Sequence, residues 1–179
     1  MKDNRQILII GGGTAGITVA ARMLRRGYDN VAVIEPSDSH YYQPLWTLVG
    51  GGEATAGETR RAEAAVMPEG ATWIKDSVAS FDPANNAVTT KGGETITYDQ
   101  LVVALGIQLD WGKIKGLEGN LGKDGICSNY SYDTVDATWR FLEGFRGGNA
   151  VFTFPSYSAS QVADHVAGSA LRSLLRRPS

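Results

Sequence analysis

Residues 7–16 read Ile7-Leu8-Ile9-Ile10-Gly11-Gly12-Gly13-Thr14-Ala15-Gly16. The four consecutive large apolar residues predict a strand that is buried on both faces, as strands of parallel sheets are. Glycines at positions 11, 13 and 16 have the G-x-G-x-x-G spacing, and residues 17–26 predict a helix that ends at Gly27. A strand, a glycine-rich turn and a helix in this order are typical of a site for the diphosphate of a dinucleotide.

Each glycine of this turn has its own physical role. Gly11 allows the tight turn, Gly13 lets a diphosphate approach the backbone, and Gly16 lets the helix pack closely on the strand. The unpaired N–H groups and the positive dipole end at the start of the helix then face the phosphates.

A second apolar run, residues 31–34, predicts the next strand and ends in Glu35, 19 positions after Gly16. An acidic side chain at this distance is placed to accept hydrogen bonds from a ribose. The alternative is a plain glycine-rich turn followed by a solvated glutamate. The agreement of strand, glycines, helix, second strand and acid favours the dinucleotide site.

Composition excludes several other classes of protein. The 179 residues give room for one domain and the start of another, and the net charge of −2 comes without a basic patch that could bind nucleic acid. The one cysteine, Cys127, excludes an intrachain disulfide, and with only His40 and His165 it excludes a zinc cluster. The first residues enter the strand directly, so we expect no signal peptide, and no apolar run reaches the ~20 residues of a membrane span.

The middle of the chain predicts further strands of both kinds. Residues 36–46 form a long aromatic-rich connection, either a surface loop or a loop over a flat cofactor ring. A short helix is expected over residues 59–67, and the apolar run 101–105 is expected to return the chain to the parallel sheet. Between these two, a strand and then an antiparallel meander are expected at residues 71–74, 77–81, 87–90 and 94–98.

The last third predicts a helix, a strand and a terminal helix. The helix is expected over residues 133–145 and the strand over residues 149–154. Apolar residues from Val162 to Leu175 then recur with helical spacing. We expect residues 156–179 to form a loosely held or locally docked helix; a membrane or partner helix is the alternative.

Several longer strings resemble a known family. The GGGTAG turn, Glu35, the meander and the run ending in Gly106 look like the flavoprotein disulfide reductase superfamily. Within it, the chain over about residues 5–155 resembles the mitochondrial-like sulfide:quinone oxidoreductases. The specific strings are YYQPLWTLVG at 41–50, ALGIQLD at 104–110, SNYS at 128–131 and GNAVFTFP at 148–155.

This resemblance implies FAD as the cofactor and assigns contacts with it. The glycine turn, the end of the second strand and the run at 104–106 would hold the dinucleotide, Val78 would hold the adenine through its backbone, and Gln43 and Pro44 would approach the flavin ring. The residues implied to bind FAD are Gly11, Gly13, Thr14, Ala15, Gly16, Glu35, Ser37, Gln43, Pro44, Val78, Ala104, Leu105 and Gly106.

The resemblance also implies an activity and shows a departure from it. The family oxidises sulfide and passes two electrons through FAD to a quinone, using a pair of redox cysteines. Here the segment after Pro155 has no cysteine, and Cys127 does not match either position of the pair. We therefore expect this chain alone to be inactive and Cys127 to be an ordinary loop residue.

The fold expected is α/β: a Rossmann-like FAD-binding domain over residues 1–147, with a parallel sheet plus an antiparallel meander. Residues 148–179 would be the truncated start of a second dinucleotide-type domain. The alternatives for function are a non-catalytic FAD-binding module and another flavin oxidoreductase, such as an NADH dehydrogenase or a flavocytochrome subunit. The expected location is cytoplasmic or peripheral on the inner membrane.

Overall fold

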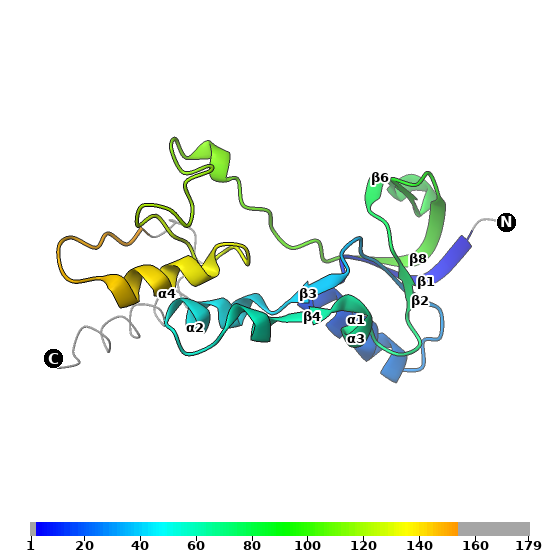
Figure 1. Cartoon of the computed structure of the whole chain (residues 1–179). Coiled ribbons are helices and arrows are strands. Elements are labelled where there is room, and N and C mark those ends of the chain that lie inside the picture. The colour runs from blue at the N-terminus through cyan, green and yellow to red at the C-terminus, as the bar shows by residue number, and fades with distance from the viewer. Residues whose placement is uncertain (1–2, 154–179) are drawn as a thin grey trace. The chain divides into compact units, whose positions relative to one another are not determined.

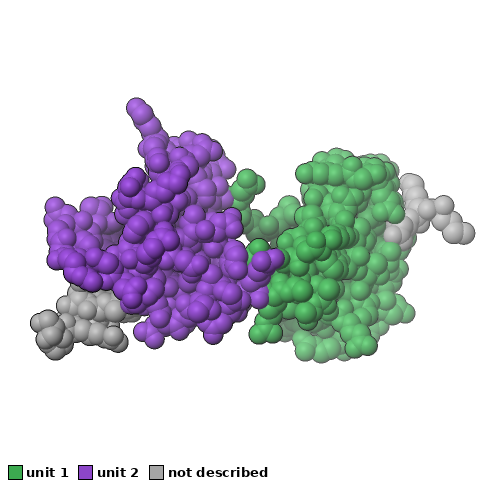
Figure 2. Space-filling view, viewed as in Figure 1, with its two compact units in different colours: residues 1–41, 61–108 green, residues 42–60, 109–179 purple. Residues whose placement is uncertain are grey.

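The computed structural model describes residues 3–153, which form two compact units (Figures 1 and 2). Unit 1 contains residues up to 41 and residues 61–108, and the described part of unit 2 contains residues 42–60 and 109–153. The predicted terminal helix lies outside the described residues. The predicted domain boundary between residues 147 and 148 stays a prediction.

Unit 1 is built on a six-stranded sheet in the order β5-β2-β1-β8-β7-β6. Three parallel pairs join β5, β2, β1 and β8, and two antiparallel pairs join β8, β7 and β6. The strands are β1 (Asp3–Ile10), β2 (Val31–Ile34), β5 (Thr72–Ile74), β6 (Val78–Asp82), β7 (Ala87–Thr90) and β8 (Thr95–Val103). The expected α/β class, with a mainly parallel sheet and an antiparallel meander, is confirmed.

The run 7–10 is buried on both faces of the sheet, as its four apolar residues predict. On one face, Ile7 and Ile9 pack with helix α1 (Thr14–Arg25) through Ala20. On the other face, Leu8 and Ile10 pack with side chains from β2 and from the antiparallel strands. Side chains of β1 point alternately to the two faces of the sheet, so this one strand contributes to both core clusters.

One continuous strand replaces the two strands expected at residues 94–98 and 101–105. β8 runs through Asp99 and Gln100 and pairs with β1 in parallel from Ile96 to Val103. Its first residues also pair antiparallel with β7, from Thr95 to Thr97. The meander and the parallel strands are therefore parts of one sheet.

The helix predicted over residues 59–67 is wrong in extent. The segment contains a 3-10 turn (Ala56–Thr59), strand β4 (Arg60–Ala62) and only one turn of helix, α3 (Glu63–Val66). β4 pairs with β3 (Ser39–Tyr41), which lies in the predicted long connection. This pairing with a distant strand overrides the local helical pattern.

Unit 2 packs helix α2 (Trp46–Gly50) with α4 (Val135–Gly144), and α4 confirms the helix expected there. Trp46 donates from Nε1 to the buried Thr59 Oγ1 at 3.0 Å. Gly52 lies against the Trp139 ring. A Cβ at position 52 would lie only 2.6 Å from the ring carbons, so the contact requires glycine.

The strand expected over residues 149–154 is not formed by residues 149–153. Val151 and Phe152 are 84% and 66% exposed, so they have no neighbouring strand to pack on among the described residues. None of the helices in residues 3–153 has the length and apolar content that crossing a bilayer requires.

Candidate dinucleotide site

The turn between β1 and α1 uses two of its glycines for the fold and leaves one open to a ligand. A Cβ on Gly11, whose φ is +103°, would lie 2.4 Å from the Ala104 carbonyl oxygen. A Cβ on Gly16 would lie 1.8 Å from the Gly11 oxygen. A Cβ on Gly13 would meet no atom within 4 Å, so Gly13 borders open space in which a phosphate could approach.

No side chain among residues 3–153 caps the start of helix α1. Its N-cap is Gly13, and the first turn carries no acidic residue. Gly13, Thr14 and Ala15 are exposed. The first N–H groups of a helix have no intrahelical acceptor, so this end can donate hydrogen bonds to an anion.

Glu35 is held beside the turn by two backbone groups. Its Oε2 accepts a hydrogen bond from Gly12 N at 2.8 Å, and its Oε1 accepts one from Ser37 N at 2.7 Å. Its own carbonyl oxygen accepts a hydrogen bond from Trp73 Nε1 at 2.8 Å. Each carboxylate oxygen keeps a second lone pair, so the group can still accept a hydrogen bond from a hydroxyl.

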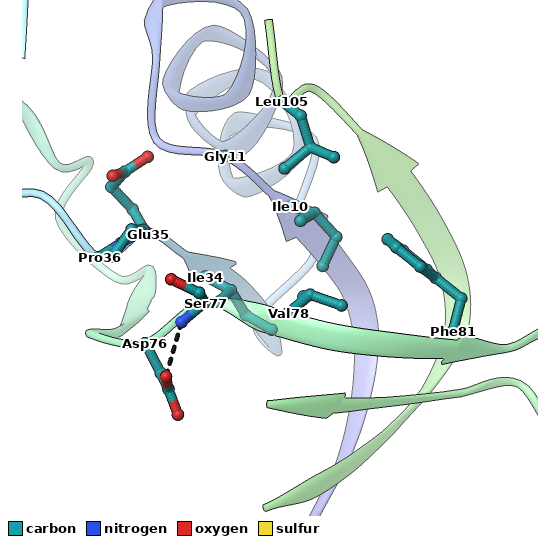
Figure 3. Close-up of a pocket in the computed structure, with 10 residues that line it drawn as sticks. All are labelled: Ile10, Gly11, Ile34, Glu35, Pro36, Asp76, Ser77, Val78, Phe81 and Leu105. Atoms are coloured by element: carbon teal, nitrogen blue, oxygen red, sulfur yellow. Dashed lines mark hydrogen bonds between the residues drawn. The ribbon is translucent and has the colours of Figure 1, made fainter. Parts of the chain in front are cut away.

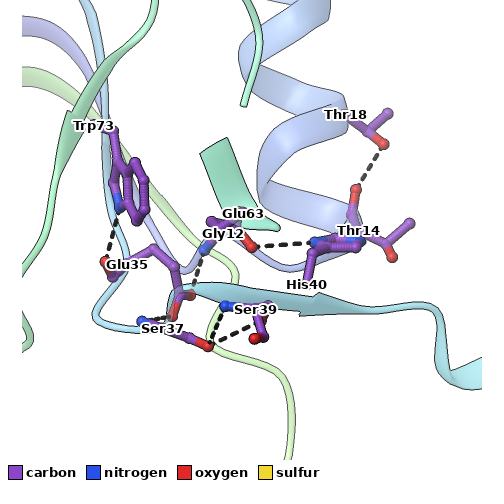
Figure 4. Close-up of polar contacts among 9 residues, drawn as sticks. All are labelled: Gly12, Thr14, Thr18, Glu35, Ser37, Ser39, His40, Glu63 and Trp73. Carbon is purple, nitrogen blue, oxygen red and sulfur yellow. Dashed lines mark hydrogen bonds and ion pairs between the residues drawn. The ribbon is translucent and has the colours of Figure 1, made fainter. Parts of the chain in front are cut away.

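Ser37 completes the loop after β2. Its hydroxyl donates to the Ser39 carbonyl oxygen at 2.8 Å, and its N–H is used by Glu35. Figure 4 shows these bonds around the Glu35 carboxylate. In this conformation Ser37 therefore stabilises the loop that carries Glu35, and its direct contact with a cofactor stays a prediction.

A cavity of about 280 Å³ opens next to the turn (Figure 3). Four of the predicted site residues line it, and six lining residues were not predicted. The lining residues are Ile10, Gly11, Ile34, Glu35, Pro36, Asp76, Ser77, Val78, Phe81 and Leu105. The cavity thus extends from the glycine turn and Glu35 to the start of β6, where the backbone of Val78 lies.

Asp76 fixes the far rim of this cavity. Its carboxylate accepts hydrogen bonds from Ser77 N at 2.7 Å and from Gly92 N at 2.9 Å, which joins the β5–β6 connection to the β7–β8 turn. Hydrogen bonds from the Thr90 side chain and from these two backbone groups lower the pKa of Asp76. The signal in the sequence was its place directly after a parallel strand, where ligand crevices form.

A buried histidine–glutamate pair lies on the other side of the turn. His40 Nδ1 and Glu63 Oε2 are 3.4 Å apart, and the two residues are 8% and 1% exposed. Burial raises the pKa of Glu63, and the nearby Glu35 raises it further, while His40 lowers it. No local pattern in the sequence indicates this pair, because the pattern predicts Glu63 in a longer helix and His40 in a loop.

The remaining predicted residues lie in two places. Ala104, Leu105 and Gly106 follow β8, and Ala104 N donates to the Ile10 carbonyl oxygen at 2.8 Å, next to the glycine turn. Gln43 and Pro44 begin a 3-10 turn (Gln43–Leu45) in unit 2. Their predicted approach to a flavin ring stays a prediction.

Comparison with known proteins decides the family. A family model described as "Pyridine nucleotide-disulphide oxidoreductase" matches residues 5–138. The chain belongs to this family. The glycine turn, Glu35 and the cavity residues all lie inside the matched range, so the site described above is part of the pyridine nucleotide-disulphide oxidoreductase fold.

Within this family the chain is similar to sulfide:quinone oxidoreductases, which confirms the predicted resemblance. It is 49% identical over 156 residues to the mitochondrial sulfide:quinone oxidoreductase of Mus musculus, covering 87% of this chain and 35% of that protein. The corresponding protein of Dictyostelium discoideum is 46% identical over 159 residues, with the same two coverages. The chain therefore spans about a third of the length of the curated relatives it matches.

A solved structure supports the same placement in the family. The crystal structure of the sulfide:quinone oxidoreductase from Aquifex aeolicus matches with a TM-score of 0.64 and 26% identity. The match covers 78% of this chain and 32% of that structure. The relatives are oxidoreductases, so the described units have the fold of part of an oxidoreductase.

Proposed function

We propose that this chain forms the FAD-binding part of a sulfide:quinone oxidoreductase. The observation that carries the proposal is the exposed, uncapped start of α1 beside an open Gly13, with Glu35 fixed at the next strand end. FAD contains a diphosphate, a ribose and an adenine in a row. The glycine turn can bind the diphosphate, the Glu35 carboxylate can bind the ribose, and the cavity can hold the adenine.

The residues of the site fit the chemistry of each part of FAD. The N–H groups of Thr14 and Ala15 would donate to the diphosphate, and the Glu35 carboxylate would accept hydrogen bonds from the adenosine ribose. The apolar side chains of Ile10, Ile34 and Val78 would contact the adenine in the cavity. We propose that Ala104, Leu105 and Gly106, which follow β8 in unit 1, line the path of FAD beyond the glycine turn.

The substrates of the whole protein are proposed to be sulfide and a quinone. FAD, when bound, supplies the two-electron redox chemistry that joins these two substrates. Residues 1–179 supply its binding and its electrostatic surroundings. Because quinones of respiratory chains are apolar, we propose that the whole protein works at a membrane surface. The single Cys127, which is exposed and does not line the cavity, is assigned no part in this chemistry.

A second candidate within the family is an NADH-dependent flavin reductase. The chain is 28% identical to the NADH-rubredoxin oxidoreductase of Clostridium acetobutylicum over 141 residues. The identity with the sulfide:quinone oxidoreductases is much higher over a longer match, so we propose the sulfide-oxidising function.

Replacing Glu35 by alanine is expected to weaken the binding of FAD roughly ten- to a hundredfold. A hydrogen bond to a charged group contributes about 1.5–3 kcal/mol, and Glu35→Ala removes the acceptor for the ribose. Isothermal titration with FAD, after circular dichroism has shown an unchanged fold, measures the effect. Glu69→Ala, a change of an exposed glutamate in unit 1, is the control and should leave the affinity unchanged. Equal affinities of Glu35→Ala and the unchanged chain would contradict the placement of the ribose.

A further inference from the structure

Two carboxylates flank the same residue of the glycine turn. A Cβ built on Gly12 would lie 2.7 Å from Glu35 Cγ and 2.7 Å from Glu63 Oε1, so both side chains touch Gly12 (Figure 4). Both oxygens of Glu35 accept hydrogen bonds, one from Gly12 N and one from Ser37 N. Glu63 differs from Glu35, because one of its carboxylate oxygens has no hydrogen-bond partner among residues 3–153.

Glu63 has one oxygen that no described residue satisfies. Its Oε2 faces His40 Nδ1 at 3.4 Å, while its Oε1 is buried without a hydrogen-bond partner among residues 3–153. A buried carboxylate with an unsatisfied oxygen and a second carboxylate close by is costly to keep ionised. A proton shared between His40 and Glu63 relieves both costs, and such a pair titrates as one unit.

Binding of a dinucleotide would add negative charge at the same turn. Its diphosphate carries two charges and would approach Gly13, the neighbour of Gly12. The electrostatic cost of an ionised Glu63 then increases, because a third anionic group lies nearby. The pair can lower this cost by taking up a proton from solvent.

We propose that the buried His40–Glu63 pair is a proton-dependent positioning element beneath the diphosphate turn, so that FAD binds with proton uptake and more tightly at lower pH. This inference rests on the proposed function, because it requires FAD at the glycine turn. Neither side chain needs to contact FAD: Glu63 acts through its charge and its contact with Gly12, and His40 acts through Glu63.

The other charged groups around the pair have partners of their own or are exposed. Asp38, whose carbonyl oxygen accepts a hydrogen bond from Glu63 N, is ion-paired with Lys75. Glu35 faces Gly12, and the exposed Arg61 lies on β4, directly before α3. The His40–Glu63 pair is therefore the charged group beside Gly12 that keeps a buried oxygen unsatisfied by the described part of the chain, so a proton there relieves an electrostatic cost.

The test measures the FAD affinity of the whole chain at about pH 6 and about pH 8. Unchanged chain, Glu63→Gln and the control Glu69→Gln are compared by titration of flavin fluorescence. Calorimetry in two buffers of different ionisation enthalpy measures the protons taken up on binding. Glu63→Gln keeps the size of the side chain but removes its charge.

We expect the unchanged chain and Glu69→Gln to bind FAD roughly three- to tenfold more tightly at the lower pH, with net proton uptake. Glu63→Gln should bind with nearly the same affinity at both pH values, because the variant has no carboxylate that can share a proton with His40. At the higher pH it should bind more tightly than the unchanged chain, a result that a merely structural role of Glu63 would not give.

Two results would overturn the inference alone. One is FAD binding by the unchanged chain with equal affinity at both pH values and no proton uptake. The other is weaker binding by Glu63→Gln at both pH values. Failure of the unchanged chain to bind FAD at either pH overturns the proposed function, and this inference with it.

Discussion

Gly13→Val is expected to abolish FAD binding while leaving the fold intact. A Cβ on Gly13 meets no protein atom within 4 Å, and its φ of −62° suits any residue, so the fold accepts the larger side chain. The same open space is where the diphosphate would approach the backbone, and the valine methyl groups would fill it. Displacement of the diphosphate removes the hydrogen bonds of the helix N-terminus, which are the main anchor of the cofactor.

The measurement is an FAD titration of Gly13→Val beside two other variants. Gly144→Val is the matched control, since Gly144 at the end of α4 also has open space around its Cβ position, and it should bind FAD normally. Gly16→Val should unfold unit 1, because its Cβ would lie 1.8 Å from the Gly11 oxygen. Normal flavin content in purified Gly13→Val would show that the glycine turn is not the phosphate site.

A polypeptide of residues 1–179 is expected to show no steady-state reduction of quinone by sulfide, even with FAD bound. The proposed chemistry needs two cysteines close enough to form a disulfide, with Cα atoms within about 7 Å. This sequence contains one cysteine, Cys127, which is exposed in unit 2. No disulfide can therefore form within the chain to accept sulfide.

The assay follows quinone absorbance with sulfide in excess, for the unchanged chain and for Cys127→Ser. Neither should turn over, and both should bind FAD equally. Slow bleaching of the flavin by free sulfide is not turnover, so only catalytic quinone reduction counts. Robust turnover that Cys127→Ser abolishes would contradict the expectation and would make Cys127 a catalytic residue.

The sequence predicted the half of the site that depends on local pattern. The run Ile7 to Gly16 predicted a strand, a turn and a helix, because four buried apolar residues and three spaced glycines have few other solutions. The sequence also predicted that the next strand ends in an acidic residue, Glu35. In the structure Glu35 is bonded to Gly12 N, next to the turn.

The features that the sequence did not predict depend on contacts between distant residues. The pairing of β3 with β4 replaces a helix that Arg60–Ala62 would favour locally. The continuity of β8 through Asp99 and Gln100 follows from its pairing with β1. The sequence alone does not link Glu63 with His40, since Glu63 follows His40 by 23 positions and neither lies in a motif.

The most direct test of the FAD site in unit 1 is a titration of the purified chain with FAD, followed by competition with the two halves of the cofactor. We expect saturable binding of one FAD per chain, displaced by ADP-ribose but not by FMN, because the glycine turn, Glu35 and the cavity form the site for the adenosine diphosphate half. Displacement by FMN alone, or no saturable binding of FAD, would contradict this assignment.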